Sequence, residues 1–234
     1  VVTEATARLV GADVDLIDIG AHSLKGLSAP LTVYRVQRHA AAYRAHSRPS
    51  TDVFEGRDEE VAVLRAQWSA TLDGDGGAVH IAGDAGIGKS RLAGALDGDL
   101  HGQQTVEYRC SPHRTGTPLW PIVERLRRSS GVGAVESEVS KISNLRAYLE
   151  RSSLRHGDDD TEMFAALLGI SSPGADLSQL GAADELRDRT LRAIVDRIRA
   201  RSVRQPLLVR FEDIHWADPT TLQLLSLLIA ATPS

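Results

Sequence analysis

The sequence is poor in sulfur-containing residues, with one cysteine, Cys110, and one methionine, Met163, among 234 residues. A single cysteine excludes an internal disulfide and is consistent with a reducing compartment. We interpret Cys110 as a small buried apolar side chain and not as a catalytic nucleophile. Because position 1 is valine and the methionine lies far along the sequence, we expect the chain to begin inside a longer polypeptide.

Long apolar runs and a net positive charge are also missing. The longest nearly apolar run, Leu224–Ala231, is far shorter than the roughly 20 residues that a transmembrane helix needs. No basic start followed by an apolar stretch marks a secretion signal. The formal net charge is −4, so no overall positive field attracts nucleic acid or anionic lipid. We therefore expect a cytoplasmic protein with no membrane partner and no direct contact with nucleic acid.

Apolar periodicity and turn residues divide the sequence into two units. Residues 1–38 predict a helix and two strands that form a hairpin, with Gly26 and Pro30 in the turn. Residues 39–52 are rich in Ala, Arg and Ser and lack an apolar period, so we interpret them as a linker. Residues 53–234 form the second unit.

Helix and strand patterns alternate in the second unit. The predicted strands lie at 78–82, 104–110 and 206–213, and the predicted helices at 58–72, after Lys89, at 184–202 and at 218–231. Most of the sequence between the last two strands is predicted as helices and loops. Asp218 is placed to cap the last helix, and Pro219 to occupy its first position.

The stretch GDAGIGKS, Gly83–Ser90, joins a predicted strand to a predicted helix and has the spacing of a phosphate loop. Glycines allow the backbone to approach phosphates closely, and the start of the helix favours an anion. Lys89 would contact the β and γ phosphates, and the Ser90 hydroxyl would bind Mg²⁺. The alternative is a glycine-rich turn without a ligand. The expected nucleotide contacts are Gly83, Asp84, Ala85, Gly86, Ile87, Gly88, Lys89, Ser90 and Arg91.

Two carboxylates, Glu212 and Asp213, end the last predicted strand, where ligands collect in open α/β sheets. Phosphoryl chemistry needs carboxylates that hold a metal and orient water. We expect Glu212 to support Mg²⁺ and Asp213 to act as the base, although the two roles could be exchanged. The alternative is a solvated start of a loop.

Three residues near this pair need separate interpretations. Arg210 lies inside the predicted strand and needs a carboxylate partner there. His215 and Trp216 follow the acidic pair, and we expect them to pack and not to touch the nucleotide.

Four segments resemble, in order and content, the AAA-like ATPase domains of the STAND signalling class. They are FEGRDEE, IAGDAGIGKSRL, CSPH followed by TPLWPIVERL, and LLVRFEDIHWADPTTLQLL. The resemblance covers residues 53–234. It implies an α/β P-loop NTPase fold, with a parallel sheet in three αβα layers and a helical insertion between the phosphate loop and the acidic strand.

The resemblance also implies a ligand and a site. Its ligands would be ATP or ADP with Mg²⁺, and its reaction ATP hydrolysis. Phe54, Gly56 and Arg57 would border the adenine, and Glu212 with Asp213 would form the Walker B pair. Lys89 would join that pair in catalysis.

One feature of the resembled family has no counterpart up to Ser234. In that family a sensor strand lies between the acidic strand and the strand before the phosphate loop. We therefore expect unpaired backbone at an exposed edge of the sheet, and little hydrolysis by these residues alone.

Residues 1–38 resemble something different, the last helix and hairpin of class III adenylate/guanylate cyclase domains. The resemblance is carried by DIGAHSLKGLSAP and LTVYRV. This small α+β segment contains none of that family's catalytic residues. The alternative is an unrelated β-hairpin.

Together the resemblances imply an ATP-binding, slowly hydrolysing switch domain of a multidomain bacterial signalling protein. Its partners would be the cyclase domain and the downstream domains of the same chain, and the complete protein could form oligomers. One alternative is that the parent protein is chiefly an adenylate cyclase with the ATPase as a sensor. Another is an ATP-dependent LuxR-type DNA-binding transcriptional regulator.

Overall fold

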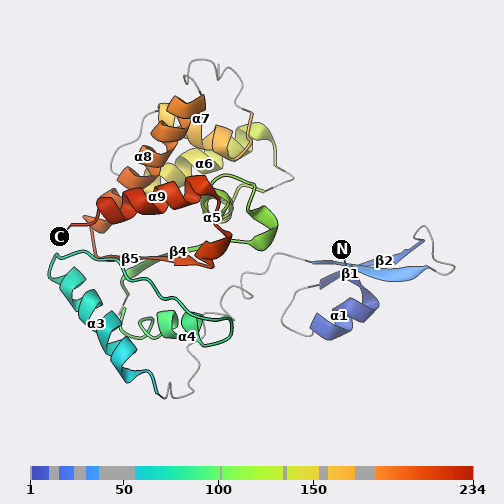
Figure 1. Cartoon of the computed structure of the whole chain (residues 1–234). Helices are drawn as coiled ribbons and strands as arrows, with labels where there is room; N and C mark the ends of the chain where they lie inside the picture. The colour runs from blue at the N-terminus through green and yellow to red at the C-terminus, as the bar shows by residue number, and fades with distance from the viewer. Residues whose placement is uncertain are drawn as a thin grey trace. The chain divides into compact units, whose positions relative to one another are not determined.

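The computed structural model describes most of the chain as two compact units, Val1–Gly56 and Arg57–Ser234, and each is described by itself (Figure 1). The described residues are 2–10, 16–23, 30–36, 56–100, 102–133, 136–152, 158–171 and 183–233. The interpreted linker, residues 39–52, lies outside them. No helix in these ranges is long and apolar enough to cross a membrane.

The first unit contains a three-stranded antiparallel sheet in the order β1-β3-β2, with one helix packed on β1 and β3. Its elements are β1 (Val2–Thr3), α1 (Glu4–Val10), β2 (Leu16–His22) and β3 (Leu31–Val36). The predicted helix and hairpin strands are confirmed, whereas β1 is too short to leave a pattern in the sequence. Gly26 lies outside the described residues.

A bulge interrupts the pairing of β2 with β3 between Asp18 and Ala21. Gly20 lies inside it with a positive φ of 88°, and its amide donates a hydrogen bond of 2.7 Å to Asp18 Oδ1. Glycine fits this position because it reaches positive φ without a steric penalty.

The second unit is built on two parallel strands, β4 (Gln104–Arg109) and β5 (Leu207–Glu212). Gln104 pairs with Leu207 at one end and Arg109 with Glu212 at the other. Since successive side chains of a strand point to opposite faces, one face is apolar and the other charged. The apolar face carries Val106, Tyr108, Leu207, Val209 and Phe211, which join the hydrophobic core. The charged face carries Glu107, Arg109, Arg210 and Glu212.

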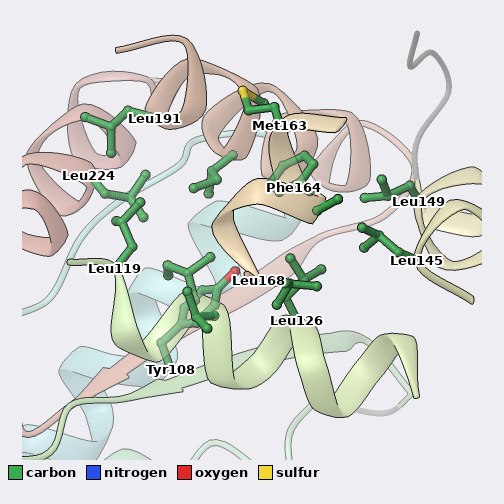
Figure 2. Close-up of a cluster of buried hydrophobic side chains, with 14 of the residues drawn as sticks. Tyr108, Leu119, Leu126, Leu145, Leu149, Met163, Phe164, Leu168, Leu191 and Leu224 are labelled. Atoms are coloured by element: carbon green, nitrogen blue, oxygen red, sulfur yellow. The ribbon is translucent and has the colours of Figure 1, made fainter. Parts of the chain in front are cut away.

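Helices cover both faces of this sheet (Figure 1). On the apolar face lie α5 (Trp120–Ser130), α6 (Glu138–Ser152), α7 (Asp158–Leu167), α8 (Ala183–Ser202) and α9 (Pro219–Ala230). Figure 2 shows their side chains meeting those of β4 in one buried cluster, which includes Leu145, Leu149, Leu191 and Leu224. The predicted helices at 184–202 and 218–231 are thus confirmed, as is the mainly helical segment before β5.

The second layer consists of α3 (Asp58–Leu72) and α4 (Lys89–Gly94). Helix α3 buries Leu64 and Trp68, as its apolar spacing predicts. Helix α4 contacts β5 through Arg210, whose Nη2 donates to Asp97 Oδ1 at 2.7 Å and to the Ala93 carbonyl at 2.8 Å. The partner that Arg210 needs is therefore Asp97, just after α4.

The predicted strand at 78–82 is wrong. Residues 75–84 form no regular secondary structure, and Val79 is 46% exposed. In the described part of the chain β5 pairs only with β4, so no strand lies beside 78–82 to complete a ladder. Among the described residues, β5 therefore has no paired strand on the side away from β4, and residues 78–82 do not add one.

Candidate functional site

The predicted phosphate loop, Gly83–Ser90, forms a tight turn that leads into α4. Gly86 and Gly88 have φ values of 82° and 92°, a region that residues with a Cβ rarely adopt. The first hydrogen bond of α4 runs from the Leu92 amide to the Gly88 carbonyl at 2.8 Å. The glycines of the motif are therefore needed for the turn itself, before any ligand is considered.

Several backbone amides of this loop lack protein partners. Within the described residues, the amides of Gly86, Gly88, Lys89 and Ser90 donate no hydrogen bond. Such amides at a helix start carry partial positive charge and form a concave site for an anion. The loop is largely exposed, so a ligand can reach these donors.

Lys89 lies across the loop and holds it closed. Its Nζ donates to the carbonyl oxygens of Gly83 at 2.9 Å and of Asp84 at 2.7 Å. An ammonium group has three N–H donors, so one is left for an additional acceptor. The loop thus offers a fixed positive charge beside free amides, a donor set that fits phosphate oxygens.

The segment before α3 also contacts the loop. Arg57 donates from Nη2 to the Ile87 carbonyl at 3.4 Å and from Nη1 to Glu60 Oε1 at 3.0 Å. The structure therefore brings Arg57 beside the phosphate loop. Gly56 has a positive φ of 78°, and Phe54 lies outside the described residues.

Glu212 is the last residue of β5, and its side chain is only 13% exposed. It accepts a hydrogen bond of 2.5 Å from Arg109 Nη2 in an ion pair across the two strands. Glu212 and Arg210 are two residues apart on one strand, so both project to the face on which α4 lies. The sheet therefore directs Glu212 to the same side as the helix that follows the phosphate loop.

Asp213 differs from Glu212 in both conformation and exposure. It has a left-handed backbone, with φ 56° and ψ 40°, and it precedes the short 3₁₀ helix Ile214–Trp216. Aspartate tolerates this conformation better than most residues, and it turns the chain out of the strand. Asp213 is exposed. Neither acidic residue has a hydrogen bond or ion pair to the loop among the described residues, so their metal and base roles stay predictions.

Arg109 is the residue that sequence reasoning missed. It lies 103 residues before Glu212 and also contacts Glu107, at 3.4 Å. The register of β4 on β5 places Glu107 opposite Arg210 and Arg109 opposite Glu212, so opposite charges meet across the strands. This alternation is visible in the sequence only after the pairing of the strands is known.

Asp218 is a helix cap, as predicted. Its Oδ1 accepts from the amides of Thr220 at 2.9 Å and Thr221 at 3.0 Å, and Pro219 occupies the first position of α9. Its Oδ2 accepts from the Leu119 amide at 3.2 Å, where the backbone has a positive φ of 55°. Asp218 therefore connects the start of α9 to the start of α5, and both of its carboxylate oxygens accept backbone hydrogen bonds.

Three more side chains, Cys110, His215 and Trp216, lie near the acidic pair. Cys110 is buried, and burial, together with the nearby Asp218 and Asp213 carboxylates, raises the pKa of its thiol to about 11. Such a thiol stays protonated at neutral pH, which agrees with an inert buried cysteine. His215 and Trp216 are exposed, and their rings pack on each other, with centroids 4.8 Å apart and planes tilted by 49°.

The described residues contain no group of three or more His, Cys, Asp or Glu side chains that could hold a metal by themselves. This is compatible with Mg²⁺, which proteins bind through one or two ligands together with substrate phosphates and water. Ser90, at the start of α4, and Glu212 are the residues whose chemistry suits such a site.

Comparison with known proteins supports the interpretation of the second unit. The model of the AAA ATPase domain family matches residues 53–234. An uncharacterized protein of Rhizobium meliloti (strain 1021) is 29% identical over 231 residues, which make up 96% of this chain but 22% of that protein. No solved structure matches the chain. By the match over 53–234, which is most of its length, the chain belongs to the AAA ATPase domain family.

Proposed function

We propose that residues 53–234 bind ATP with Mg²⁺ at the phosphate loop and act as a slowly hydrolysing regulatory switch. The observation that carries the proposal is the set of unpartnered amides at Gly86, Gly88, Lys89 and Ser90, with the Lys89 ammonium held over the same loop. These donors fit the β and γ phosphates, and family membership implies a nucleotide ligand.

Each residue of the proposed site has a distinct role. The loop amides and the third N–H of Lys89 would bind and orient the phosphates, and the Ser90 hydroxyl would be a ligand of bound Mg²⁺. Mg²⁺, when bound, would neutralise negative charge on the phosphates. Arg57, beside Ile87, borders the base and ribose side of the loop.

The acidic pair supplies the proposed hydrolytic chemistry. Glu212 would hold the water shell of a bound Mg²⁺, and Asp213 would accept a proton from the water whose oxygen bonds to the γ phosphorus while the bond to the leaving ADP oxygen breaks. Glu212 is bound to Arg109, so it acts at the metal only if it shares or exchanges that contact. We therefore propose slow turnover, in which ATP closes the domain and hydrolysis reopens it.

Replacement of the loop lysine tests nucleotide binding. In Lys89→Ala the affinity for Mg-ATP, measured by isothermal titration calorimetry, should fall about tenfold to a hundredfold, because a charge-assisted hydrogen bond contributes about 1.5–3 kcal/mol. Lys141→Ala removes the same charge from α6, where Lys141 pairs with Glu138, and should leave the affinity unchanged. An unchanged affinity in Lys89→Ala would count decisively against the proposed site.

The proposed output of the switch is a nucleotidyl cyclase domain in the same parent protein. The support is the resemblance of residues 1–38 to the end of such a domain, together with the helix and antiparallel hairpin found there. The parent protein should then convert ATP or GTP to a cyclic nucleotide with Mg²⁺ or Mn²⁺. Absence of cyclic product from purified, folded parent protein would remove this output and leave a DNA-binding regulator as the alternative.

A further inference from the structure

A cavity lined by arginines lies in the second unit, away from the phosphate loop. Its volume is about 200 Å³, and it lies at the amino end of β4, among α5, α6 and the end of α8. Its lining residues are Gln104, Arg125, Ser129, Tyr148, Arg151, Arg201 and Arg204. A smaller cavity of about 40 Å³ adjoins it, shares Arg125, Tyr148 and Arg201, and adds Arg197.

The lining contains four guanidinium groups and no carboxylate. Within the described residues, the side chains of Arg125, Arg151 and Arg204 form neither a hydrogen bond nor an ion pair. Arg125 lies over the Tyr108 ring, with its Cζ 5.9 Å from the centroid. Like charges so close together repel, and a bound anion would relieve that repulsion.

Two arginines are held in place by the fold: Arg201, the fourth arginine of the lining, and Arg197, which lines the adjoining cavity. Arg201 donates from Nε and Nη2 to Gln104 Oε1, at 3.2 and 2.8 Å. Arg197 donates to the carbonyls of Tyr148 and Leu149 at 3.3 and 3.4 Å, and its Cζ lies 5.2 Å from the Tyr148 ring centroid. Arg201 is therefore positioned before a ligand binds, whereas Arg151 and Arg204 are exposed and would become ordered on binding.

Stabilisation of helix ends accounts for only part of this set, and Arg151 and Arg204 are exposed. Basic side chains near the end of a helix stabilise its free carbonyls. Arg197, which belongs to α8, does this for the end of α6. Arg151 and Arg204, near the ends of α6 and α8, donate to no carbonyl among the described residues. Burial lowers the pKa of Arg197 and the nearby Arg201 acts in the same direction, although Tyr148, Tyr108 and Asp160 oppose it. The charge of Arg197 is thus costly to bury beside Arg201.

The position of the cavity separates it from the nucleotide site. Tyr108 lines the adjoining cavity from the apolar face of the sheet, whereas Arg210 contacts the end of α4 from the charged face. Gln104 and Glu212 lie at opposite ends of the paired strands. Since each strand residue advances the chain by roughly 3.3 Å, these ends are about 16 Å apart.

We propose that this cavity is a second anion site, which binds a compact phosphate-bearing ligand of about the size of a pyrophosphoryl group. Guanidinium groups form paired hydrogen bonds with phosphate oxygens, which favours phosphate at a site rich in arginine. The volume is several times the roughly 30 Å³ of a water molecule but below the roughly 300 Å³ at which drug-sized pockets begin. The shared chemistry is a diphosphate group, either free or part of a nucleotide.

Calorimetric titration of the whole chain with inorganic pyrophosphate tests the proposal. The ionic strength is fixed at about 0.15 M in all titrations, because salt screens the attraction between the arginines and the anion. We expect saturable binding that Arg151→Gln/Arg204→Gln weakens about tenfold, through loss of two exposed cationic contacts that each change the affinity about threefold. The matched control is Arg192→Gln/Arg199→Gln, which removes two exposed arginines of α8 that do not line the cavity and should change the affinity less than about twofold.

The Lys89→Ala variant distinguishes this site from the phosphate loop. Pyrophosphate binding should persist in Lys89→Ala, and its loss there with retention in Arg151→Gln/Arg204→Gln would place the anion on the loop and overturn the proposal. Absence of binding to the folded chain, or equal weakening by the α8 control, would overturn it as well. If the double variant does not fold, Arg204→Gln alone should still weaken binding about threefold.

Titration of Lys89→Ala with ADP then separates the two sources of the ligand. Tighter binding of ADP than of pyrophosphate supports the site with a nucleotide as ligand. Equal binding supports it with the diphosphate group alone as the recognised element.

Discussion

At the scale of single residues, charges on the α4-facing side of the sheet are tolerated because each has a partner. Arg210 is 13% exposed and pairs with Asp97, and Arg109 pairs with both Glu107 and Glu212. A guanidinium inside a parallel strand would otherwise lose several kcal/mol of hydration without compensation. The pairing with Asp97 also attaches the end of α4 to β5, so it helps to position the phosphate loop.

Replacement of Arg210 should therefore cost more stability than replacement of an exposed arginine. We expect Arg210→Met to lower the free energy of unfolding by about 1–3 kcal/mol, because Asp97 and the Ala93 carbonyl lose their donor. Arg65→Met is the matched control, since Arg65 pairs with Asp99 while 58% exposed, and should cost less than about 1 kcal/mol. Urea unfolding of both variants measures the difference in the free energy of unfolding. Equal losses would show that the buried pair contributes no more to stability than the exposed pair.

At the scale of elements, α3, α4, α8, α9 and the two paired strands follow from local pattern. Amphipathic spacing places Leu64 and Trp68 of α3, and Ile194 and Val195 of α8, on buried faces. The capping chemistry of Asp218 and Pro219 fixes the start of α9. The phosphate-loop spacing predicted the turn at 83–90 because glycine, lysine and serine there have specific backbone and charge requirements.

The strand predicted at 78–82 could not be decided from local pattern, because a strand exists only with a hydrogen-bonded neighbour. Its apolar composition is real, but in the described residues no strand lies beside it. The same reason hid the Glu107–Arg109–Glu212 contacts, which depend on a register between segments about 100 residues apart. The arginine cavity likewise depends on three helices whose packing the sequence does not reveal.

At the scale of the whole molecule, the nucleotide loop and the hydrophobic core belong to the second unit. Every residue of the main buried cluster lies between Val106 and Leu224, and the loop contacts named above also lie within Arg57–Ser234. A chain of about 180 residues is long enough to form an independent core. The family match begins close to the same boundary, at residue 53.

Removal of residues 1–52 should therefore preserve both folding and nucleotide binding. We expect the shortened chain, which keeps Phe54 and Gly56, to unfold in one cooperative urea transition. It should bind Mg-ATP within about twofold of the whole chain, because the loop contacts named above lie within the second unit. Calorimetry on both chains checks the affinity, and Lys89→Ala in the shortened chain checks that the same loop is used. Loss of binding by a shortened chain that still unfolds cooperatively would show that the first unit contributes to the site, and would contradict an ATPase domain that functions as its own folding unit.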